Sequence, residues 1–523
     1  MRIVIIGSGF GGLSAAIRLQ AQGHDVTIVE KLDKAGGRAY VFEQDGFTFD
    51  AGPTIITAPW IIDELFALTG HKTADYVKLV QLDPFYNVRF EDGTVFHYNG
   101  DRESLVRQVR EFNAADVAGY ERFREQAWKI FNVGMPLIDR AFLTPSSMLK
   151  VIPDLVRLRA DRSVAALADK YMKDERLRQV FSFHPLLVGG NPYRASSIYA
   201  LIHKLEQQWG VMFAMGGTGA LVKGLVRAFQ DIGGTIRYES EVAEITMHAS
   251  APRTTGVRLV DGEQLPADAV VCNGDLAQAY RTLIPAARRP SMSDAKIARM
   301  RHSMSLFVIY FGTNRRYENI AHHEIIMGKR YKALLEDIFE KKILADDFSL
   351  YLHRPTATDR SLAPAGHDCW YVLSPVPHLG GNVDWEAVGQ RYRNRIMEYL
   401  EERYLPDLSK HIVTERRVDP RYFEQTLNSY VGAAFGTEPV LTQSAYMRPQ
   451  NVSRDIPNLY FAGAGTHPGA GLPGVMASGK IVAELIGSAG TATAGRGTAT
   501  AGGGTATAAR GTAPAGMGTT TAG

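Results

Sequence analysis

The stretch Ile3-Val4-Ile5-Ile6-Gly7-Ser8-Gly9-Phe10-Gly11-Gly12 decides the fold of the N-terminal part of the chain. Its β-branched start predicts a buried strand, and the good helix formers of residues 13–22 predict a helix. Between them, Gly7 permits a tight turn, Gly9 lets backbone approach a pyrophosphate, and Gly12 lets the helix pack close to the strand. The helix would offer unpaired N–H groups and the positive end of its dipole to phosphates. The stretch therefore predicts a dinucleotide-binding turn.

A second strand is predicted over residues 25–30, which completes a βαβ unit of the length that a parallel crossover needs. It ends at Glu30, where an acid is placed to bind a ribose hydroxyl. An acid at this position, instead of an arginine, argues against a 2′-phosphate and so against NADP. Next along the chain, Gly36-Gly37-Arg38 offers a second close backbone approach and a cation for phosphate charge, although an ordinary surface turn has a similar composition.

Later segments are expected to complete two domains. Strand-like runs expected to return to the nucleotide-binding domain are 235–238, 242–247, 255–259 and 269–272. Runs expected to form an antiparallel sheet in a second domain are 305–311, 348–353 and 370–376. Residues 458–486 revert to a strand, a glycine-rich turn and a helix, so the chain is expected to rejoin the first domain.

The predicted fold class is therefore α/β, with a Rossmann-like nucleotide-binding domain, a second mixed α+β substrate domain and a helical membrane-facing region. The expected boundaries are 1–75, 216–280 and 446–486 for the first domain, 76–215 and 281–445 for the second, and 487–523 for a tail. The tail consists almost entirely of Gly, Ala and Thr, which cannot offset the entropy of ordering it, so it is expected to be disordered.

Composition excludes several classes of protein. The chain has 523 residues, of which 45% are apolar, so a disordered or fibrous protein is excluded. A formal net charge of +3 with both signs intermixed gives no broad basic field, so nucleic acid is not an expected partner. Only Cys272 and Cys369 occur, which argues against a disulfide framework and favours a reducing, cytoplasmic compartment. No secretion signal and no run of about 18 apolar residues is found.

Several further motifs carry a family resemblance. They are Phe47-Thr48-Phe49-Asp50-Ala51-Gly52-Pro53-Thr54, Phe181-Ser182-Phe183-His184, Leu187-Val188-Gly189-Gly190-Asn191-Pro192, Gly216-Gly217-Thr218-Gly219-Ala220-Leu221, Ser374-Pro375-Val376-Pro377-His378-Leu379-Gly380 and Gly463-Ala464-Gly465-Thr466-His467-Pro468-Gly469-Ala470-Gly471-Leu472-Pro473-Gly474-Val475. With the two glycine motifs above, they resemble the bacterial-type phytoene desaturases, which lie within the flavin amine oxidase and carotenoid desaturase superfamily. The resemblance runs from about residue 1 to about residue 486, and the tail has no counterpart.

The resemblance implies FAD as the cofactor and the stepwise dehydrogenation of 15-cis-phytoene through phytofluene, zeta-carotene and neurosporene, commonly to all-trans-lycopene. It does not fix the number of steps, because members with nearly the same motifs stop at different products, neurosporene among them. A flavin amine oxidase acting on a soluble amine and a non-redox flavoprotein, such as an isomerase or binding module, are the rival hypotheses.

The residues expected to bind FAD come from the motifs together with the resemblance. They are Gly7, Ser8, Gly9, Phe10, Gly11, Gly12, Glu30, Lys31, Gly36, Gly37, Arg38, Gly52, Pro53, Thr54, Val242, Gly463, Gly465, Gly474 and Val475. The helix predicted to begin near Gly474 would direct its N-terminal amides at the edge of the flavin where negative charge collects on reduction.

The residue that accepts the departing proton is left unassigned. His184, His203, Glu206 and His378 lie in or near the motifs, but each suits a hydrogen-bonded structural role equally well, because geometry must precede the assignment of a base. A metal site at 322–324 is rejected, since adjacent histidines on a strand point to opposite faces.

A C40 polyene is dissolved in lipid, so the protein is expected to be cytoplasmic and to associate peripherally with the cell membrane. Residues 148–162 combine an apolar body with a basic fringe and suit an interfacial helix, although packing inside the second domain explains them equally well and Pro153 limits the helix. Oxygen or a quinone is the expected electron acceptor.

Overall fold

The computed structural model describes residues 1–488, so the tail expected to be disordered lies, from residue 489 onward, outside the described part of the chain. Strand β1 (Arg2–Ile6), helix α1 (Phe10–Ala21) and strand β2 (Asp25–Val29) form the expected βαβ unit. β1 lies at the centre of a five-stranded sheet of order β19-β13-β1-β2-β9, in which every pair is parallel. The remaining strands are β13 (Ala269–Cys272), which pairs with β1, and the edge strands β9 (Thr235–Arg237) and β19 (Leu459–Phe461).

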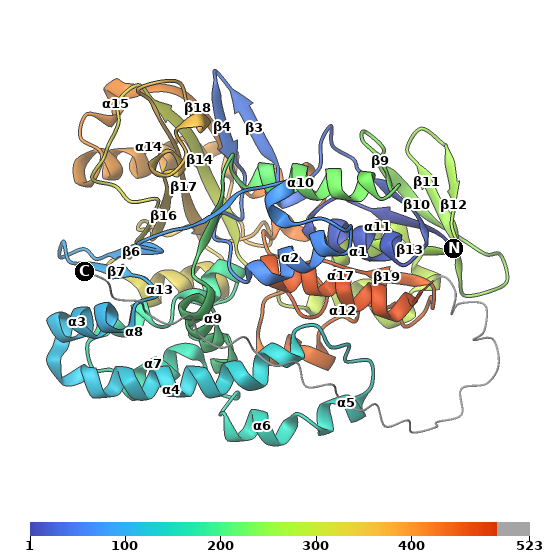
Figure 1. The fold of residues 1–523 in the computed structure, drawn as a ribbon, viewed down its shortest axis with the longest axis horizontal. Coiled ribbons are helices and arrows are strands. Elements are labelled where there is room, and N and C mark those ends of the chain that lie inside the picture. The colour runs from blue at the N-terminus through green and yellow to red at the C-terminus, as the bar shows by residue number, and fades with distance from the viewer. Residues whose placement is uncertain (489–523) are drawn as a thin grey trace, which may run out of the picture.

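Helix α17 (Leu472–Ile486) brings the end of the described chain against its beginning. In Figure 1 it lies beside α1, and the Ser14 hydroxyl donates to the backbone oxygen of Met476 at 2.7 Å. A Cβ on Gly479 would come within 2.8 Å of the Ser14 side chain and within 2.7 Å of the Ala15 backbone nitrogen, both in α1. Only glycine therefore permits this approach of the two helices. The other helices over this sheet are α2 (Pro59–Ala67) and α10 (Thr218–Asp231).

Two of the runs expected to return to the nucleotide-binding domain form a small sheet of their own beside the first one. β10 (Val242–Met247), β11 (Thr254–Leu259) and β12 (Gln264–Pro266), a strand that the sequence did not predict, are joined in antiparallel order. Connections this short allow only antiparallel pairing, whereas a parallel crossover needs a dozen or more residues. Their apolar face packs against the first sheet through Val257 and Val270.

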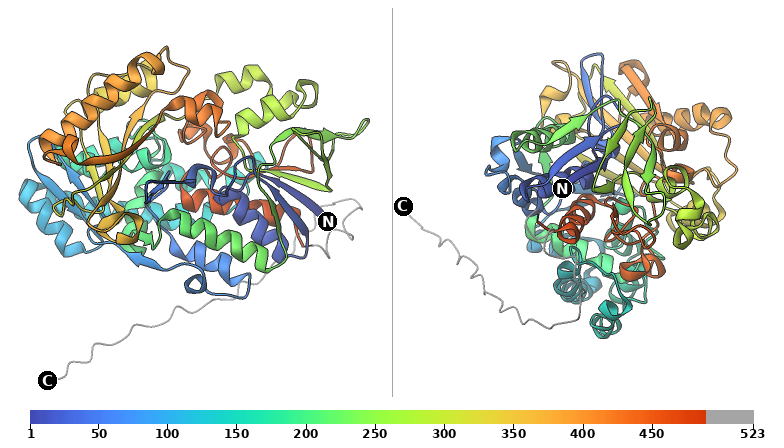
Figure 2. Two further views of the ribbon diagram at one scale, coloured as in Figure 1. Left: turned by 90° about the horizontal axis from the view of Figure 1, so that it is seen from above. Right: turned by 90° about the vertical axis from the view of Figure 1, so that its right-hand side faces the viewer.

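The second domain is built on a seven-stranded sheet of order β18-β14-β17-β16-β15-β6-β7. The three runs expected as its strands are β14 (Ser305–Thr313), β16 (Leu350–His353) and β17 (Asp368–Val376), and all its pairs are antiparallel except β15 with β6. The remaining strands are β6 (Tyr86–Arg89), β7 (Val95–Tyr98), β15 (His323–Ile326) and β18 (Ile412–Val418). The left view of Figure 2 places this sheet and the first one towards opposite ends of the molecule.

The alternation of side chains along β14 and β17 separates two apolar layers. Phe307, Phe311 and Trp370 pack with helix α14 (Trp385–Arg403) on one face. Tyr310 and Tyr371 belong to the layer on the other face, which borders the cavity described below. Smaller elements around the two domains are β3 (Val41–Gln44), β4 (Phe47–Asp50), β5 (Leu79–Gln81), β8 (Met212–Ala214), α11 (Leu276–Leu283), α12 (Asp294–Arg299), α13 (Tyr331–Glu336), α15 (Leu408–His411) and α16 (Pro420–Gln425).

Helices of the second domain occupy the lower half of the view in Figure 1. They are α3 (Arg102–Asn113), α4 (Val117–Gly134), α5 (Pro145–Leu149), α6 (Ile152–Arg157), α7 (Val164–Tyr171), α8 (Glu175–Val180) and α9 (Leu201–Trp209). The single interfacial helix expected over 148–162 is wrong: two short helices form, and Pro153 occupies the first turn of the second, where its missing N–H is tolerated. Among residues 1–488, none of the helices combines the length and apolar composition that crossing a membrane requires.

Asp50 joins β4 to the start of α10. Its carboxylate accepts the backbone N–H groups of Thr218 at 2.8 Å and Gly219 at 3.1 Å. Burial raises the pKa of this carboxyl group to about 6 in spite of the two hydrogen bonds, which lower it. The folded state therefore binds a proton at Asp50 more tightly than the unfolded state does.

We expect the free energy of unfolding of the wild type, relative to Asp50→Asn, to fall as the pH rises. The proton-linked stabilisation is fully present below the ordinary pKa of 3.8 and is lost as the pH rises through about 6. A shift of this size corresponds to roughly 3 kcal/mol. Denaturant unfolding of both proteins at pH 4.5 and pH 7.5 measures the difference, and a difference that does not change with pH would contradict the assignment.

Candidate functional site

One cavity of about 650 Å³ runs from the glycine-rich turn after β1 into the space between the two domains. Its lining is predominantly apolar. Of the residues expected to bind a cofactor, those that line it are Gly7, Ser8, Gly9, Phe10, Gly11, Glu30, Lys31, Gly36, Gly37, Arg38, Gly52, Pro53, Thr54, Val242, Gly463, Gly474 and Val475. Gly12 and Gly465 do not line it. The structure thus brings together segments that are far apart in the sequence.

The glycines at the start of α1 leave backbone facing the cavity. Helix α1 begins after Gly9 without a side-chain cap and without an acid in its first turn, so its first N–H groups face no competing anion. A Cβ on Gly12 would lie 2.2 Å from the backbone oxygen of Gly7, which confirms its expected packing role. Gly37 lies across from this turn, since its Cβ would be 3.7 Å from the Cα of Gly9. Two backbone surfaces therefore border the same part of the cavity.

The two backbone surfaces, at the start of α1 and at Gly37, form a cradle for a dinucleotide. Glu30 lies at the edge of this cradle and is 5% exposed. Its carboxylate accepts the N–H of Ser8 at 2.8 Å, the Ser8 hydroxyl at 2.5 Å and the N–H of Leu32 at 2.9 Å. The acid thus fixes the turn that follows β1 while it faces the cavity, as the sequence predicts.

Arg38 lines the cavity but has protein partners as well. Its guanidinium donates to the Ser429 hydroxyl at 2.9 Å and lies 3.7 Å from the Asp275 carboxylate, while its buried Nε has no partner. Burial lowers the pKa of the Arg38 guanidinium, and the neighbouring Asp275 carboxylate offsets part of this effect.

A second helix N-terminus faces the same cavity. Helix α17 begins after Gly471, whose φ of +93° needs a glycine, and it also lacks a side-chain cap and an acid in its first turn. Pro473 occupies the first turn, where its missing N–H leaves no hydrogen bond unmade. The cavity therefore receives the positive ends of two helix dipoles.

Sequence reasoning missed Asn273. It follows β13 directly, its amide nitrogen lies 3.4 Å from the backbone oxygen of Gly7, and its buried Oδ1 has no hydrogen-bond partner. Cβ atoms added to Gly11 or Gly463 would approach that Oδ1 within 3.0 Å. The available signal was a polar side chain at the carboxyl end of a parallel strand, where ligands of such sheets bind.

Gly465 has a packing role instead of the expected cofactor contact. A Cβ at this position would lie 2.7 Å from the Cβ of Leu276, on α11. Gly465 therefore packs against α11 and does not line the cavity.

The far part of the cavity is bounded by α5, α6, α9 and the inner face of the second sheet. Met148 of α5, Leu155 of α6 and Val151 between the two helices line it. On the outer side of the same helices Leu149 is 68% exposed and Val156 is 66% exposed. A thin helical wall therefore separates the cavity from an exposed apolar surface.

Of the four groups considered as proton acceptors, Glu206 borders the cavity. It is fully buried; its Oε2 accepts the Tyr86 hydroxyl at 2.8 Å and lies 3.2 Å from Nε2 of His184, while Oε1 has no partner. His203 bonds the Tyr98 hydroxyl, and burial lowers the pKa of its imidazole. His378 accepts the N–H of Gly380, and burial lowers the pKa of its imidazole to about 4.

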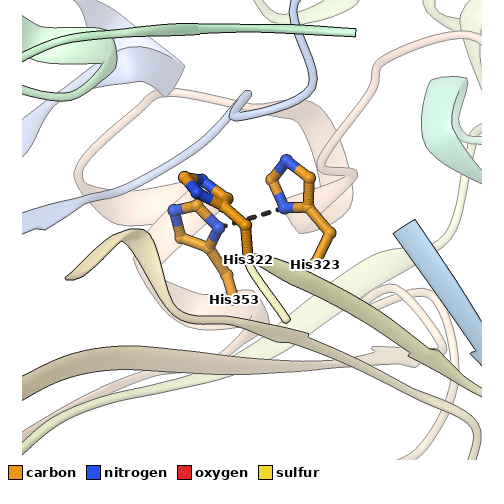
Figure 3. A group of neighbouring side chains, drawn as sticks. All are labelled: His322, His323 and His353. Atoms are coloured by element: carbon orange, nitrogen blue, oxygen red, sulfur yellow. Dashed lines mark hydrogen bonds between the residues drawn. The ribbon is translucent and has the colours of Figure 1, made fainter. Parts of the chain in front are cut away.

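Figure 3 shows three buried imidazoles, His322, His323 and His353, that face one another. The expectation that His322 and His323 point to opposite faces is wrong, because β15 begins only at His323 and His322 lies outside its pleat. His323 and His353 are cross-strand partners on β15 and β16. Their nitrogens are close enough to hold a metal ion, but the group includes no carboxylate or thiolate.

A parallel sheet with a glycine-rich turn, two uncapped helix N-termini and an acid at the end of β2 fits a bound dinucleotide, and the adjoining apolar cavity fits an apolar substrate. The fold and site thus define a dinucleotide-dependent oxidoreductase. The pattern of the flavin containing amine oxidoreductases matches residues 10–487, so the chain belongs to this family, and FAD is its cofactor.

Relatives place the chain more narrowly among the phytoene desaturases. It is 49% identical to the phytoene desaturase (lycopene-forming) of Pantoea ananas over 92% of this chain and 98% of the relative. It is 41% identical to the phytoene desaturase (neurosporene-forming) of Rhodobacter capsulatus over 93% and 94%. The fold matches an oxidoreductase from Methanosarcina mazei with a TM-score of 0.59 at 16% identity, over 92% of this chain and 100% of that one.

We expect Gly9→Val and Glu30→Ala to weaken FAD binding by about 10- to 100-fold, which is the effect of losing a hydrogen bond to a charged group or of filling the cradle. A Cβ at Gly9 already comes within 3.0 Å of the Asn273 amide, so the larger side chain must intrude. Quenching of FAD fluorescence on titration measures the affinity. Glu244→Ala, which removes a half-exposed carboxylate paired with Arg258, is the matched control; unchanged affinity in both test variants would exclude the cradle.

Proposed function

We propose that the protein is an FAD-dependent oxidoreductase acting on CH–CH groups, a phytoene desaturase that converts 15-cis-phytoene through phytofluene, zeta-carotene and neurosporene to all-trans-lycopene. The observation that carries the proposal is the continuity of the dinucleotide cradle with an apolar cavity whose lining includes Met148, Val151 and Leu155. An apolar polyene could extend along such walls with its reacting carbons near the cofactor.

The residues that would hold FAD are those expected residues that line the cavity, together with Asn273. The first N–H groups of α1 would bind the pyrophosphate, and Glu30 would bind the ribose hydroxyls after exchanging its bonds to Ser8. Bound FAD would accept the hydride that desaturation removes. The N–H groups at the start of α17 would stabilise negative charge at the neighbouring edge of the cofactor.

The relatives support lycopene as the end product. The lycopene-forming relative is 49% identical, whereas the neurosporene-forming relative is 41% identical. A desaturase that stops at neurosporene, or that acts on another polyene, is the second candidate. A soluble amine substrate would make no contact with the apolar walls of the cavity. A flavoprotein without a redox role would have no reduced cofactor whose negative charge the N-terminus of α17 could stabilise.

The exposed apolar residues of α5 and α6 support attachment to one face of the membrane. Leu149, Ile152 and Val156 face outward beside the exposed cations Lys150 and Arg157, which is the composition of an interfacial surface. Substrate could pass between these helices directly from lipid into the cavity. The cytoplasmic face of the membrane suits the two buried free thiols, Cys272 and Cys369, because that compartment is reducing. Oxygen or a quinone would reoxidise the cofactor.

Anaerobic incubation of the FAD-loaded protein with phytoene in liposomes tests the reaction. We expect the flavin absorbance to bleach, and lycopene to accumulate after an acceptor is readmitted. Extraction and chromatography identify the pigments. Bleaching by benzylamine instead of phytoene would favour an amine oxidase, and unchanged flavin with isomerised polyene would favour the non-redox role.

We expect the double variant Leu149→Ser/Val156→Ser to bind anionic liposomes at least about 10-fold more weakly, because two apolar side chains no longer enter the interface. Cosedimentation with the vesicles measures binding. Val260→Ser is the control, since Val260 is 64% exposed at a turn of the small antiparallel sheet. Equal losses in the control and the double variant would contradict the proposed surface.

A further inference from the structure

A line of hydroxyl groups begins at the wall of the cavity, on the inner face of the second sheet. The Thr54 hydroxyl contacts the Tyr371 hydroxyl at 2.6 Å and the Tyr351 hydroxyl at 2.9 Å. All three residues line the cavity, and Tyr351 is the most exposed of them. Thr54 follows directly after Gly52 and Pro53, so the line starts beside residues expected to hold FAD.

The line continues from Tyr351 into the histidine cluster of Figure 3. The Tyr351 hydroxyl lies 2.7 Å from Nδ1 of His323, and that same nitrogen lies 3.1 Å from Nδ1 of His353. A neutral imidazole nitrogen has either one N–H or one lone pair, so Nδ1 of His323 can share a single proton between two partners. Tyr351, His323 and His353 are therefore linked atom to atom.

His322 leads from this cluster towards the surface. Its ring centre lies 4.9 Å from that of His353, and its Nδ1 lies 2.6 Å from the hydroxyl of Thr358, which is partly exposed. The Nε2 atoms of all three histidines are buried without a protein partner. The step from His353 to His322 therefore depends on the proximity of the two rings, whose Nε2 atoms are available to a water molecule.

The charge state of the cluster suits transfer of a proton better than its storage. Burial lowers the pKa of His323 to about 3 and lowers the pKa values of His322 and His353 as well. Burial also raises the pKa of the Tyr351 hydroxyl. All four groups are thus neutral at rest, and an imidazole that receives a proton passes it on readily.

A metal ion is the alternative occupant of the cluster. Three imidazoles can ligate a divalent cation such as Zn²⁺, and one nitrogen from each ring lies within 4.8 Å of the others. Thr358 and Tyr351 occupy Nδ1 of His322 and of His323, which leaves the Nε2 atoms for a metal or for water. The contact between Nδ1 of His323 and Nδ1 of His353 favours the hydrogen-bonded line, and metal analysis separates the two occupants.

We propose that Tyr351, His323, His353 and His322 form the route by which the proton of each desaturation leaves the cavity, an inference that rests on the proposed function. Two C–H bonds on adjacent carbons break: one hydrogen leaves as a hydride, for which FAD is the acceptor, and the other leaves as a proton. The electron pair of the second C–H bond becomes the new double bond.

Tyr351 oxygen takes up the substrate proton as its own proton passes to Nδ1 of His323, which donates in turn to Nδ1 of His353. His353 releases a proton from its Nε2 side towards His322 and Thr358, and the proton ends in solvent. Tyr351 and His323 return to their starting forms. His353 becomes the Nδ1–H tautomer and must return to the Nε2–H tautomer before the next desaturation. Glu206 also borders the cavity, but it is fully buried, whereas Tyr351 is partly exposed and is joined to the histidine cluster.

Tyr351→Phe tests the route because it removes the hydroxyl and keeps the ring. We expect single-turnover flavin bleaching by phytoene to slow by about 100-fold, the usual contribution of a positioned proton acceptor. Tyr392→Phe is the matched control: it removes another buried hydroxyl of this domain, bonded to Ser374 at 2.7 Å on the other face of the sheet, and should bleach at the wild-type rate. Equal rates in all three proteins would overturn the proposal.

Nitrogen NMR of the full-length FAD-loaded protein, labelled at histidine, gives a readout that needs no turnover. We expect Tyr351→Phe to shift the ring signals of both His323 and His353, and Tyr392→Phe to shift neither. A change confined to His323 would overturn the continuous line. Metal analysis after dialysis completes the test, because a metal retained by the wild type and lost in His353→Asn would assign the cluster to that ion instead.

A failure of the wild type to bleach with phytoene would reject the proposed desaturation, whatever the variants do. Normal bleaching in the wild type with the same rate in Tyr351→Phe would reject the proton route alone. The two proposals therefore fail on different observations.

Discussion

The close approach of backbone at the start of α1 is the constraint on which the rest of the structure depends. Side chains are excluded there: a Cβ on Gly12 would lie 2.2 Å from the Gly7 oxygen, and one on Gly11 would lie 2.9 Å from the Gly463 nitrogen. Segments from three parts of the chain meet at this point because none of them carries a side chain. Their meeting leaves the N–H groups of two helix starts directed at one cavity, where dipoles of the same sign favour a bound anion.

The second constraint is the pleat of the seven-stranded sheet. One face of β14 and β17 packs against α14 and forms a core, so the alternate residues must face the other way, where the cavity lies. Tyr371 and Tyr351 reach the cavity for this reason, and their hydroxyl groups then need partners within an otherwise apolar wall. Thr54 supplies one partner, and the histidine cluster supplies another.

The cradle could be predicted from the sequence because its elements are local. A glycine at fixed spacing, an acid at a strand end and a helix start each depend on a few neighbouring residues, and all but two of the expected cofactor residues line the cavity. Asn273 and the cluster of His322, His323 and His353 could not be predicted, because strand pairing brings them to their sites. The break between α5 and α6 falls just before Pro153, the residue that already limited a continuous helix in the sequence, although the amphipathic pattern ran across it.

Neutral hydrogen-bonding groups in the cavity wall reconcile two requirements of an apolar substrate site. A fixed charge beside a polyene would lose its hydration without gaining a partner, whereas a hydroxyl or a neutral imidazole costs far less to bury once it is hydrogen-bonded. Yet the reaction must release a proton, and a wholly apolar wall offers it no acceptor. Tyr351 meets both requirements, because its hydroxyl is neutral at rest and is joined at 2.7 Å to a ring that can carry the proton away. The polar atoms of this wall thus follow from the chemistry that the site has to complete.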